Sequence, residues 1–457
     1  MERLFYKDKE VKSVGVYGLG RSNLGVLRYL NKHYPYLKLI LRNDSAKIPK
    51  DVTRVAKFDE IYIGNAASTD IREDLVFLSP TVRKDKLRCD AHTAFTSDAQ
   101  FYFENARNPT LAITGSDGKS TTTTLTALML SSVGDSVPAI GNIGVPMTPQ
   151  LDKALRYAVA ELSSFQLMNF SPKCMRALIT NVSENHLDFH SSYDEYIWAK
   201  ENILRECAER IFNYDCEVSQ CLMSRYSAFG VYSLTKSEEE LKKSVSAEVY
   251  VTLSDSFVVA NGEKIFDTGM LKCKNRHTIA NFAAAVALTY GIADRARIRQ
   301  VAEEFSGLAH RCECVGVFSG IKYINSSIDS TPKRTVTTLS SFSERLTVIL
   351  GGKSKGLDYK TLLPTLTERA KRVVLTGATA GEIKAVLLSD TAFCESGIPI
   401  IEKTDFEEAV LAAIRASELG DTVILSPAST SFDAFRDFEE RGKKFKEIIR
   451  NYYYKRT

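Results

Sequence analysis

Short apolar runs alternate with helix-like stretches along almost the whole chain. Residues 13–17, 37–41 and 75–78 are compact apolar or β-branched runs that predict buried strands. Between the first two runs, apolar positions such as Leu24 and Leu27 recur at helical spacing. Strands that alternate with helices in this way are typical of α/β architecture with parallel sheets.

The same alternation restarts twice further along the chain. Pro109 and the polar residues before it interrupt the periodicity, and a second restart follows residues 307–311. Later strands are predicted at residues 111–114, 157–160, 177–179, 346–350, 373–375 and 422–425, with an antiparallel pattern at 245–264, an alanine-rich helix at 277–290 and a hairpin at 315–324. We therefore expect three α/β domains in series, over residues 1–106, 107–309 and 310–457.

Composition narrows the class of protein. The 457 residues include 60 Lys and Arg against 56 Asp and Glu, a formal net charge of +4, which argues against a protein that mainly neutralises nucleic-acid phosphates. No stretch reaches the roughly 18 consecutive apolar residues that a membrane helix needs, and the first residues lack the apolar centre of a signal peptide. Nine cysteines without a CxxC pair indicate a reducing compartment, so we expect a cytoplasmic protein.

A glycine-rich turn follows the first predicted strand and opens a helix. Gly18, Gly20 and Gly25 lie in the context of a Rossmann-type turn, but the last glycine comes late for the dinucleotide fingerprint. Arg42 stands where an acidic ribose ligand would end the second strand. A tight turn without a ligand is an equal alternative. If the turn binds a ligand, the helix N-terminus favours a diphosphate.

Residues 114–122, Thr-Gly-Ser-Asp-Gly-Lys-Ser-Thr-Thr, carry the strongest local signal. Glycines let backbone amides converge on a phosphate, Lys119 neutralises its charge, and the Ser120 hydroxyl can ligate Mg²⁺. Ile113 occupies the place of the first glycine of a strict P-loop. A simple glycine turn capped by Ser or Thr is the alternative, but the flanking strand and helix favour a phosphate loop.

Three further polar groups stand at or after predicted strands. Glu161 closes a buried strand, where a carboxylate is costly unless it is paired or holds a metal. His186 and His190 are expected at the end of the next strand and could ligate zinc or be satisfied polar residues. Lys200 follows on a helix, and by itself it would be interpreted as a solvated surface lysine.

Taken in order, these motifs resemble those of the Mur ligase family, the ATP-dependent amide-forming enzymes of peptidoglycan precursor synthesis. The resemblance covers essentially the whole chain and includes the segments at 114–122, 141–144, 161–167, 186–188 with Lys200, 310–313, 351–358 and 425–433. The Glu-Leu-Ser-Ser-Phe-Gln-Leu segment and the C-terminal Ser-Phe-Asp run favour the branch that adds D-glutamate over its sister ligases.

The resemblance implies an N-terminal Rossmann-like domain for a UDP-sugar, a central P-loop ATPase-type domain for ATP and a C-terminal Rossmann-like domain for an amino acid. It implies ATP- and Mg²⁺-dependent addition of D-glutamate to UDP-N-acetylmuramoyl-L-alanine (UDP-MurNAc-L-alanine) through an acyl phosphate. We expect a cytoplasmic monomer that acts on small molecules, with neither a nucleic-acid partner nor a membrane span.

The resemblance also assigns roles to residues of this chain. Catalytic roles fall to Lys119, His186 and Lys200, the last as a carbamate formed with CO₂. The metal ligands would be Ser120, Glu161, His186 and carbamylated Lys200. The nucleotide would be held by Gly115, Ser116, Asp117, Gly118, Lys119, Ser120, Thr121, Asn281 and Arg311. The substrates would contact Gly18, Gly20, Arg21, Ser22, Asn142, Ser164, Lys355, Ser431, Phe432 and Phe438.

The chain departs from the family pattern at four positions. Asn185, Thr278 and Ser326 replace the usual Asp, Asn and Asp, and Arg42 replaces a commoner acidic residue. Two alternatives remain open: another ligase of the same class, such as a folylpolyglutamate synthetase-like enzyme or a neighbouring Mur ligase, and a nucleotide-dependent switch protein. A switch would leave the C-terminal motifs unexplained.

Overall fold

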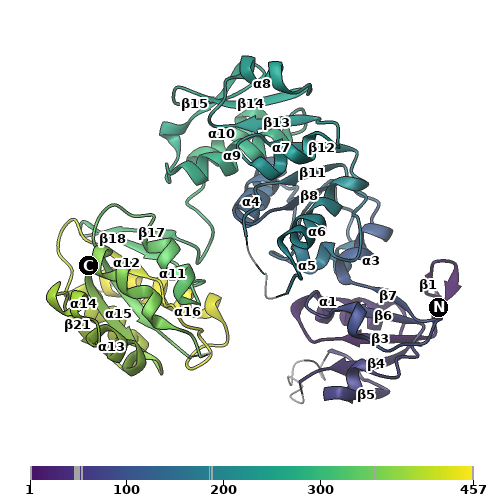
Figure 1. The fold of residues 1–457 in the computed structure, drawn as a ribbon, viewed down its shortest axis with the longest axis horizontal. Coiled ribbons are helices and arrows are strands. Elements are labelled where there is room, and N and C mark those ends of the chain that lie inside the picture. The colour runs from purple at the N-terminus through teal and green to yellow at the C-terminus, as the bar shows by residue number, and fades with distance from the viewer. Residues whose placement is uncertain are drawn as a thin grey trace. The chain divides into compact units, whose positions relative to one another are not determined.

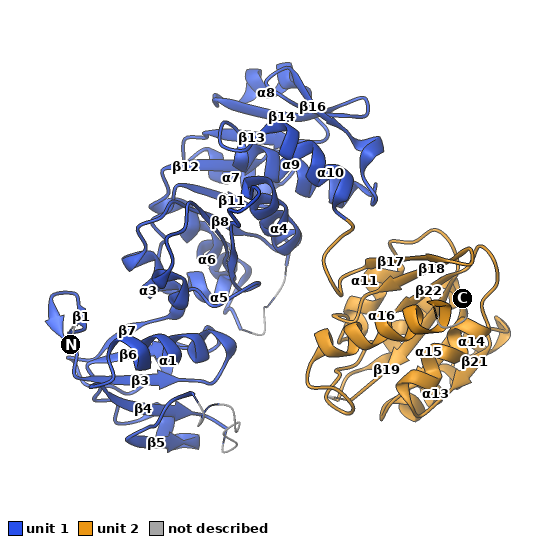
Figure 2. Cartoon of the chain, turned by 180° about the vertical axis from the view of Figure 1, so that it is seen from behind, with its two compact units in different colours: residues 1–305 blue, residues 306–457 orange. Residues whose placement is uncertain are grey.

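The computed structural model describes residues 3–45, 52, 55–184, 186, 189–354 and 356–454, and the chain divides into two compact units (Figures 1 and 2). The first unit spans residues 1–305 and contains a five-stranded and a nine-stranded sheet, besides a small hairpin. The second spans residues 306–457 and contains a six-stranded sheet. Helices connect the strands of all three sheets, which confirms the α/β class. The division into three domains stays a prediction, since the first two sheets belong to one unit.

The five-stranded sheet is parallel throughout. Its order is β5 (Glu60–Ile63), β4 (Lys38–Asn43), β3 (Ser13–Tyr17), β6 (Leu75–Leu78) and β7 (Ala94–Thr96). The accompanying elements are the hairpin strands β1 (Phe5–Tyr6) and β2 (Lys9–Glu10) and the helices α1 (Arg21–His33) and α3 (Asp98–Asn105). Val16 and Tyr17, neighbours on opposite faces of the central strand, are both buried, as a strand covered on both faces requires.

The nine-stranded sheet combines a parallel and an antiparallel part. Its order is β16 (Glu263–Asp267), β15 (Phe257–Ala260), β14 (Val249–Ser254), β13 (Gly230–Ser233), β12 (Glu209–Asn213), β11 (Arg176–Ile179), β8 (Thr110–Thr114), β10 (Ala158–Glu161) and β9 (Ala139–Gly141). The strands from β9 to β14 are parallel, and β14, β15 and β16 pair antiparallel, which confirms the alternating pattern seen at residues 245–264.

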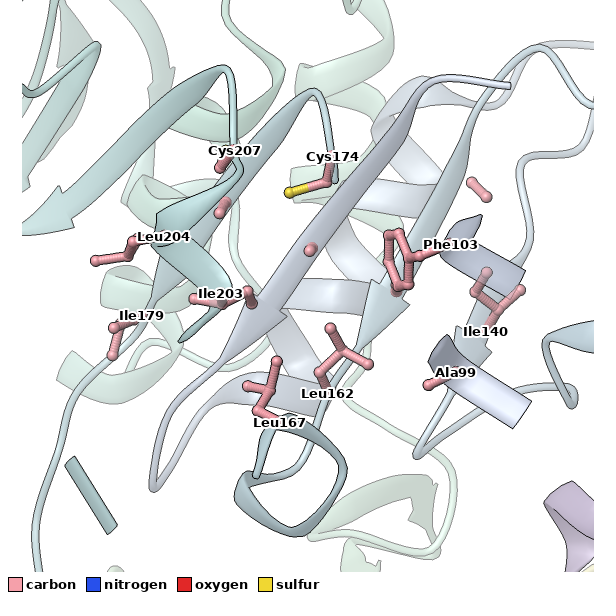
Figure 3. Packing of buried hydrophobic residues seen from close by; sticks show 14 of the residues in the cluster. Ala99, Phe103, Ile140, Leu162, Leu167, Cys174, Ile179, Ile203, Leu204 and Cys207 are labelled. Atoms are coloured by element: carbon pink, nitrogen blue, oxygen red, sulfur yellow. The ribbon is translucent and has the colours of Figure 1, made fainter. Parts of the chain in front are cut away.

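Helices pack on this sheet through apolar or small side chains. They are α4 (Lys119–Leu130), α5 (Ser164–Leu167), α6 (Tyr193–Arg205), α7 (Glu217–Met223), α8 (Glu238–Ser244), α9 (Arg276–Thr289) and α10 (Arg295–Glu304). The alanine-rich α9 is buried from Phe282 to its end, since small side chains allow close packing. Leu167, Ile203 and Leu204, from α5 and α6, join one buried cluster with strand residues such as Ile179 (Figure 3).

The six-stranded sheet of the second unit has one antiparallel edge. Its order is β17 (Glu313–Phe318), β18 (Ile321–Asn325), β22 (Thr422–Leu425), β19 (Leu346–Gly351), β20 (Ala370–Thr376) and β21 (Ile400–Glu402). The predicted hairpin is confirmed by the antiparallel pair β17 and β18. The helices are α11 (Pro332–Leu339), α12 (Leu363–Arg369), α13 (Ala380–Leu388), α14 (Thr391–Glu395), α15 (Phe406–Arg415) and α16 (Phe438–Tyr454).

The strand order creates a natural ligand crevice in the nine-stranded sheet. The chain leaves β8 towards β9 and β10 on one side and then crosses to β11 on the other side. In the register of these strands Glu161 lies opposite Ile113, and Ile179 lies opposite Thr114. Ligands of open α/β sheets bind at the carboxyl ends of strands where the order reverses in this way. The segments that follow β8, β10 and β11 meet at that point.

Candidate active site

The loop between β8 and α4 has the geometry of a phosphate cradle. Gly115 and Gly118 have φ values of 150° and 78°, and a Cβ at either would clash with a side-chain oxygen of Thr180 or Asn281. α4 begins directly after Gly118 and has no side-chain cap, so its first backbone N–H groups face the loop. Lys119 Nζ donates a 2.8 Å hydrogen bond to Ser116 O inside the loop.

Residues just after β11 brace this loop, and we did not single them out from the sequence. Thr180 Oγ1 donates to Asp117 O at 2.6 Å, and the Asn181 side chain exchanges two hydrogen bonds with the Asp117 backbone. Ser116 Oγ lies 2.9 Å from the Tyr196 hydroxyl. The sequence feature that could have indicated these bracing residues is the polar run Thr-Asn-Val-Ser at 180–183, which follows a buried strand.

Glu161 is fully buried at the carboxyl end of β10. Its Oε1 accepts a 2.6 Å hydrogen bond from Asn142 Nδ2, whereas its Oε2 has no hydrogen-bond partner among the described residues. A buried carboxylate oxygen without a partner is costly in free energy, and a bound cation removes that cost. The site therefore fits a hard divalent metal that takes oxygen ligands.

Lys200 is buried rather than solvated, with 2% of the residue exposed. Its Nζ donates a 2.7 Å hydrogen bond to Gly115 O and lies over the Tyr196 ring. Burial, reinforced by the nearby Lys119 ammonium and opposed by Asp117 and Glu161, lowers the pKa of Lys200 well below its usual value. The structure thus brings Lys119, Lys200 and Glu161 together around the phosphate loop.

His186 does not end a strand, contrary to our expectation. β11 ends at Ile179, and His186 follows in the next loop with a left-handed φ of 57°. The predicted strand 177–179 also ends there, and Thr180 and Asn181 then turn their side chains to the phosphate loop. His186 is exposed, and its ring lies 5.0 Å from that of Phe165, measured between centroids. Asn185 lies outside the described residues.

The other predicted nucleotide residues of the first unit lie on or beside α4. Ser120 is buried in the first turn, and Thr121 follows it. Asn281 of α9 accepts a 3.3 Å hydrogen bond from Thr122 Oγ1 through Oδ1. Asn275 caps α9 and accepts from Thr278 N at 2.8 Å, so Thr278 keeps the helix start in place.

The turn after β3 also exposes a helix N-terminus. Gly18 has a φ of 86°, and Gly20 precedes α1 without a side-chain cap. Arg21 Nη2 donates a 2.8 Å hydrogen bond to Gly144 O, which ties this turn to the segment that carries Asn142. Ser22 lies in the first turn of α1. The arrangement can receive an anionic group at the start of α1.

Arg42 lies within β4 rather than at its end and serves the fold. Its buried guanidinium pairs with Glu73 at 2.6 Å and donates to the carbonyls of Ala67, Thr69 and Asp70. The strand continues to Asn43, and the exposed Asp44 follows, where it accepts a 2.6 Å hydrogen bond from the Tyr17 hydroxyl. The carboxylate that follows this strand is therefore at position 44 and not at 42.

Two adjoining hollows flank Phe165, the residue after Ser164. One, of about 390 Å³, is lined by Pro80, Arg83, Met168 and Phe189 among others. The other, of about 130 Å³, is lined by Ser79, Lys84 and Gln166 among others. Both contain apolar walls and cationic side chains, as a site for an anionic organic ligand requires.

The remaining predicted residues belong to the second unit. Ser431 is buried, Phe432 is exposed, and Phe438 begins α16 with its carbonyl accepting from Ser327 Oγ. Arg311 precedes β17, and Lys355 lies outside the described residues.

Ser326 is buried, and Asp329 supplies a buried carboxyl nearby that accepts from Ser426 Oγ at 2.8 Å. Burial raises the pKa of Asp329.

The described residues contain neither a membrane-spanning helix nor a cluster of metal-ligating side chains. No helix in the described ranges is long and apolar enough to cross a membrane. Across the same ranges, no three His, Cys, Asp or Glu side chains gather in a way that could hold a metal ion. A metal at Glu161 would therefore need hydroxyl, phosphate or carbamate oxygens as further ligands, as magnesium sites with nucleotides commonly have.

Comparisons with known proteins place the chain among enzymes with this architecture. Residues 113–289 match the model for the Mur ligase middle domain, and residues 310–429 match the model for the Mur ligase glutamate ligase domain. The chain is similar to the UDP-N-acetylmuramoylalanine–D-glutamate ligase of Acetivibrio thermocellus, with 36% identity over 97% of both chains. It is likewise similar to the enzyme of that name from Ruminiclostridium cellulolyticum, with 34% identity over 98% of both chains.

Solved structures give the same result for the fold. The UDP-N-acetylmuramate–alanine ligase of Thermotoga maritima matches with a TM-score of 0.58 and 19% identity, over 97% of this chain and all of that one. A pseudomurein peptide ligase of Methanothermus fervidus matches with a TM-score of 0.54 and 15% identity, over 96% of this chain and all of that one. The sequence resemblance is thereby confirmed, and the chain belongs to the Mur ligase family.

Proposed function

We propose that this chain is an ATP-dependent ligase that joins D-glutamate to UDP-MurNAc-L-alanine. The observation that carries the proposal is the group formed by Lys119, Lys200 and Glu161 around an uncapped phosphate loop. Similarity over nearly the full length to enzymes named for this reaction supports the choice of substrates. Cytoplasmic location and a monomeric state are part of the proposal.

The chemistry requires activation of a poor electrophile. A carboxylate oxygen of UDP-MurNAc-L-alanine attacks the γ-phosphorus of ATP, and ADP leaves, which gives an acyl phosphate. The amine of D-glutamate then attacks the acyl carbon, loses a proton, and expels inorganic phosphate. Both reactants of the first step are anions, so catalysis depends mainly on positioning and charge neutralisation. Lys119, held at the loop by Ser116 O, supplies one positive charge there.

The oxygen donors at the phosphate loop fit Mg²⁺. Glu161 Oε2 and the Ser120 hydroxyl are oxygen ligands at the loop, and His186 and a carbamate on Lys200 would serve a second ion. When bound, the metal would offset the repulsion between the phosphate and the substrate carboxylate. Glu161 would contribute to metal binding through Oε2, while the hydrogen bond from Asn142 holds Oε1 in place.

The state of the Lys200 amine supports the proposed carbamate. Only the neutral amine attacks CO₂, forming an N–C bond and releasing a proton, and the product carries a negative charge. The lowered pKa of Lys200 increases the neutral fraction at physiological pH. The resulting anion would be attracted by the nearby Lys119 ammonium, which disfavours a positive charge on Lys200.

The substrate sites are assigned as follows. The UDP diphosphate would lie at the start of α1, against Gly18, Gly20, Arg21 and Ser22. Asn142 and Ser164 would contact the muramoyl part, next to the hollows around Phe165. Arg311 and Asn281 would contact the nucleotide, and D-glutamate would meet Lys355, Ser431, Phe432 and Phe438.

The test is phosphate release from ATP with each substrate omitted in turn. The proposal expects release only with ATP, UDP-MurNAc-L-alanine and D-glutamate together. Release without regard to either substrate would indicate a nucleotide-dependent switch. A preference for another amino acid, such as lysine or diaminopimelate, would assign the chain to a sister ligase. Ser431→Ala should raise the KM for D-glutamate and leave that for ATP unchanged.

A further inference from the structure

The pairing of β8 with β11 continues beyond the ends of both strands. Thr180 N donates to Thr114 O at 2.9 Å, and Ser116 N donates to Asn181 O at 2.8 Å. Thr180 is itself held from the next strand, because Asn213 Nδ2 donates to Thr180 O at 2.7 Å. The first half of the phosphate loop is therefore fastened to the end of β11 through its main chain.

The side chains of Thr180 and Asn181 hold one residue of the loop, Asp117. Asn181 Oδ1 accepts a 2.9 Å hydrogen bond from Asp117 N. Asp117 O accepts from Thr180 Oγ1 at 2.6 Å and from Asn181 Nδ2 at 3.0 Å. Thr180 is 3% exposed, so its hydrogen bond is shielded from water. We call these three hydrogen bonds the Asp117 clasp.

The clasp fixes the direction of the peptide that joins Asp117 to Gly118. In a trans peptide the C=O and N–H groups point in opposite directions, so Gly118 N–H points away from Thr180 and Asn181. Gly118 has a φ of 78°, and the freedom of glycine lets the preceding peptide reverse its direction at low cost. Without the clasp, this peptide could turn its carbonyl oxygen to the side where Gly118 N–H now points.

The two preceding carbonyl groups of the loop are held by lysines instead. Lys200 Nζ donates to Gly115 O at 2.7 Å, and Lys119 Nζ donates to Ser116 O at 2.8 Å. A bound phosphate would attract Lys119 by its charge, and a carbamate on Lys200 would have no ammonium group to donate. The donors of the clasp are neutral, so an anionic ligand does not draw them away. We therefore expect the clasp to persist when a nucleotide is bound.

We propose that Thr180 and Asn181 are positioning residues that keep the Asp117–Gly118 peptide in the orientation that presents an N–H group, and not a carbonyl oxygen, to the phosphates of a bound nucleotide. A carbonyl oxygen that faces a phosphate repels it, whereas an N–H group donates to it. A protein in which this peptide is reversed for part of the time binds the nucleotide more weakly, in proportion to that fraction. The nucleotide and its place at this loop rest on the proposed function.

The first test measures the Kd of the full-length protein for ADP with Mg²⁺ by calorimetry. Thr180→Val keeps the shape of the side chain and removes its hydroxyl, and Asn181→Ala removes both hydrogen bonds of the amide. Each variant should raise this Kd at least about tenfold, the worth of one net hydrogen bond. Thr180→Ser keeps a hydroxyl donor and should recover most of the affinity that Thr180→Val loses.

Asn261 gives the matched control. Its side chain also holds the main chain twice, accepting from Tyr250 N at 2.8 Å and donating to Glu248 O at 2.9 Å, beside the antiparallel part of the same sheet. Asn261→Ala should lower the melting temperature and leave the Kd for ADP unchanged. The same result for Asn181→Ala, a lower melting temperature with an unchanged Kd, would mean that Asn181 only stabilises the fold, and it would overturn the proposal.

The second test needs no nucleotide. Hydrogen exchange in the ligand-free protein is followed by mass spectrometry on the peptide that covers residues 114–122. Asn181→Ala and Thr180→Val should speed exchange in this peptide, and Asn261→Ala should not. Exchange at the wild-type rate in both clasp variants would overturn the proposal, even where the Kd rises.

Two further outcomes are decided in advance. If Thr180→Val does not fold, Asn181→Ala decides by itself, since its side chain is only half-buried. A wild type that binds ADP but joins no D-glutamate would refute the proposed function, while the Kd and the exchange rates would still decide the role of the clasp.

Discussion

The side-chain amide of Asn142 donates a 2.6 Å hydrogen bond to one carboxylate oxygen of Glu161, while the other oxygen, fully buried, has no hydrogen-bond partner in the part of the chain that the structure describes. The bond fixes the direction of the carboxylate at the carboxyl end of β10. A buried charge of this kind destabilises the metal-free fold. A bound cation removes this cost by contacting the second carboxylate oxygen of Glu161.

Glu161→Gln should therefore separate metal binding from stability. The amide keeps the size of the side chain but removes the charge, so the Mg²⁺ concentration for half-maximal turnover should rise at least about tenfold. The melting temperature of the metal-free variant should equal or exceed that of the wild type, because no unpaired carboxylate is buried. An unchanged Mg²⁺ requirement would remove Glu161 from the metal site.

Lys119→Ala should abolish ATP turnover and leave the fold intact. Lys119 contacts the loop carbonyl of Ser116 and belongs to no apolar cluster, so its loss costs little packing. Activity and thermal melting are measured together, with exposed Lys243→Ala as the control. Phosphate release at the wild-type rate from a folded Lys119→Ala protein would contradict the phosphate-loop assignment.

Lys200→Ala tests the carbamate. The variant should fold and bind UDP-MurNAc-L-alanine but turn over almost no ATP, since it lacks an anion beside the phosphate. Acetate should partly restore turnover by filling the vacated space, whereas depletion of CO₂ should slow only the wild type and bicarbonate should reverse that effect. Full activity of the variant would contradict the proposal, and inactivity without rescue would show that Lys200 is necessary without identifying its chemistry.

Glu73→Ala tests the structural role of Arg42. Because Arg42 and Glu73 are both buried, removal of the carboxylate should leave an uncompensated charge and cost about 3–5 kcal/mol in the free energy of unfolding. The exposed pair of Lys384 and Glu402 gives a matched control, and Glu402→Ala should cost less than about 1 kcal/mol. A similarly small loss for Glu73→Ala would mean that Arg42 is solvated and available to a ligand.

Much of the fold could be predicted from local pattern. The strands of the nine-stranded sheet that surround the site are short apolar runs next to glycine or polar turns, and β8, β10 and β11 lie within one or two residues of the predicted positions. The antiparallel edge at β14 to β16 was visible as alternation. The order of the strands in the sheet could not be predicted, because crossover connections leave no local signal in a single sequence.

The site was predicted less completely, for physical reasons. The burial of Lys200 depends on packing of α6 against the phosphate loop, which helical periodicity does not reveal. Arg42 looked like a ligand position because β4 ends two residues later than the predicted strand 37–41, and its partner Glu73 is 31 positions away. The bracing by Thr180 and the contact of His190 with Ser164 likewise join segments that are distant in sequence.

The central claim is that the chain activates the substrate carboxylate by phosphorylation before D-glutamate attacks it. The most direct measurement uses UDP-MurNAc-L-alanine labelled with ¹⁸O in its carboxylate, together with ATP and D-glutamate. The acyl-phosphate route transfers one carboxylate oxygen to the phosphate that leaves. We predict inorganic phosphate carrying one ¹⁸O atom, one equivalent for each D-glutamate joined. Unlabelled phosphate, or release of phosphate without D-glutamate incorporation, would contradict the account.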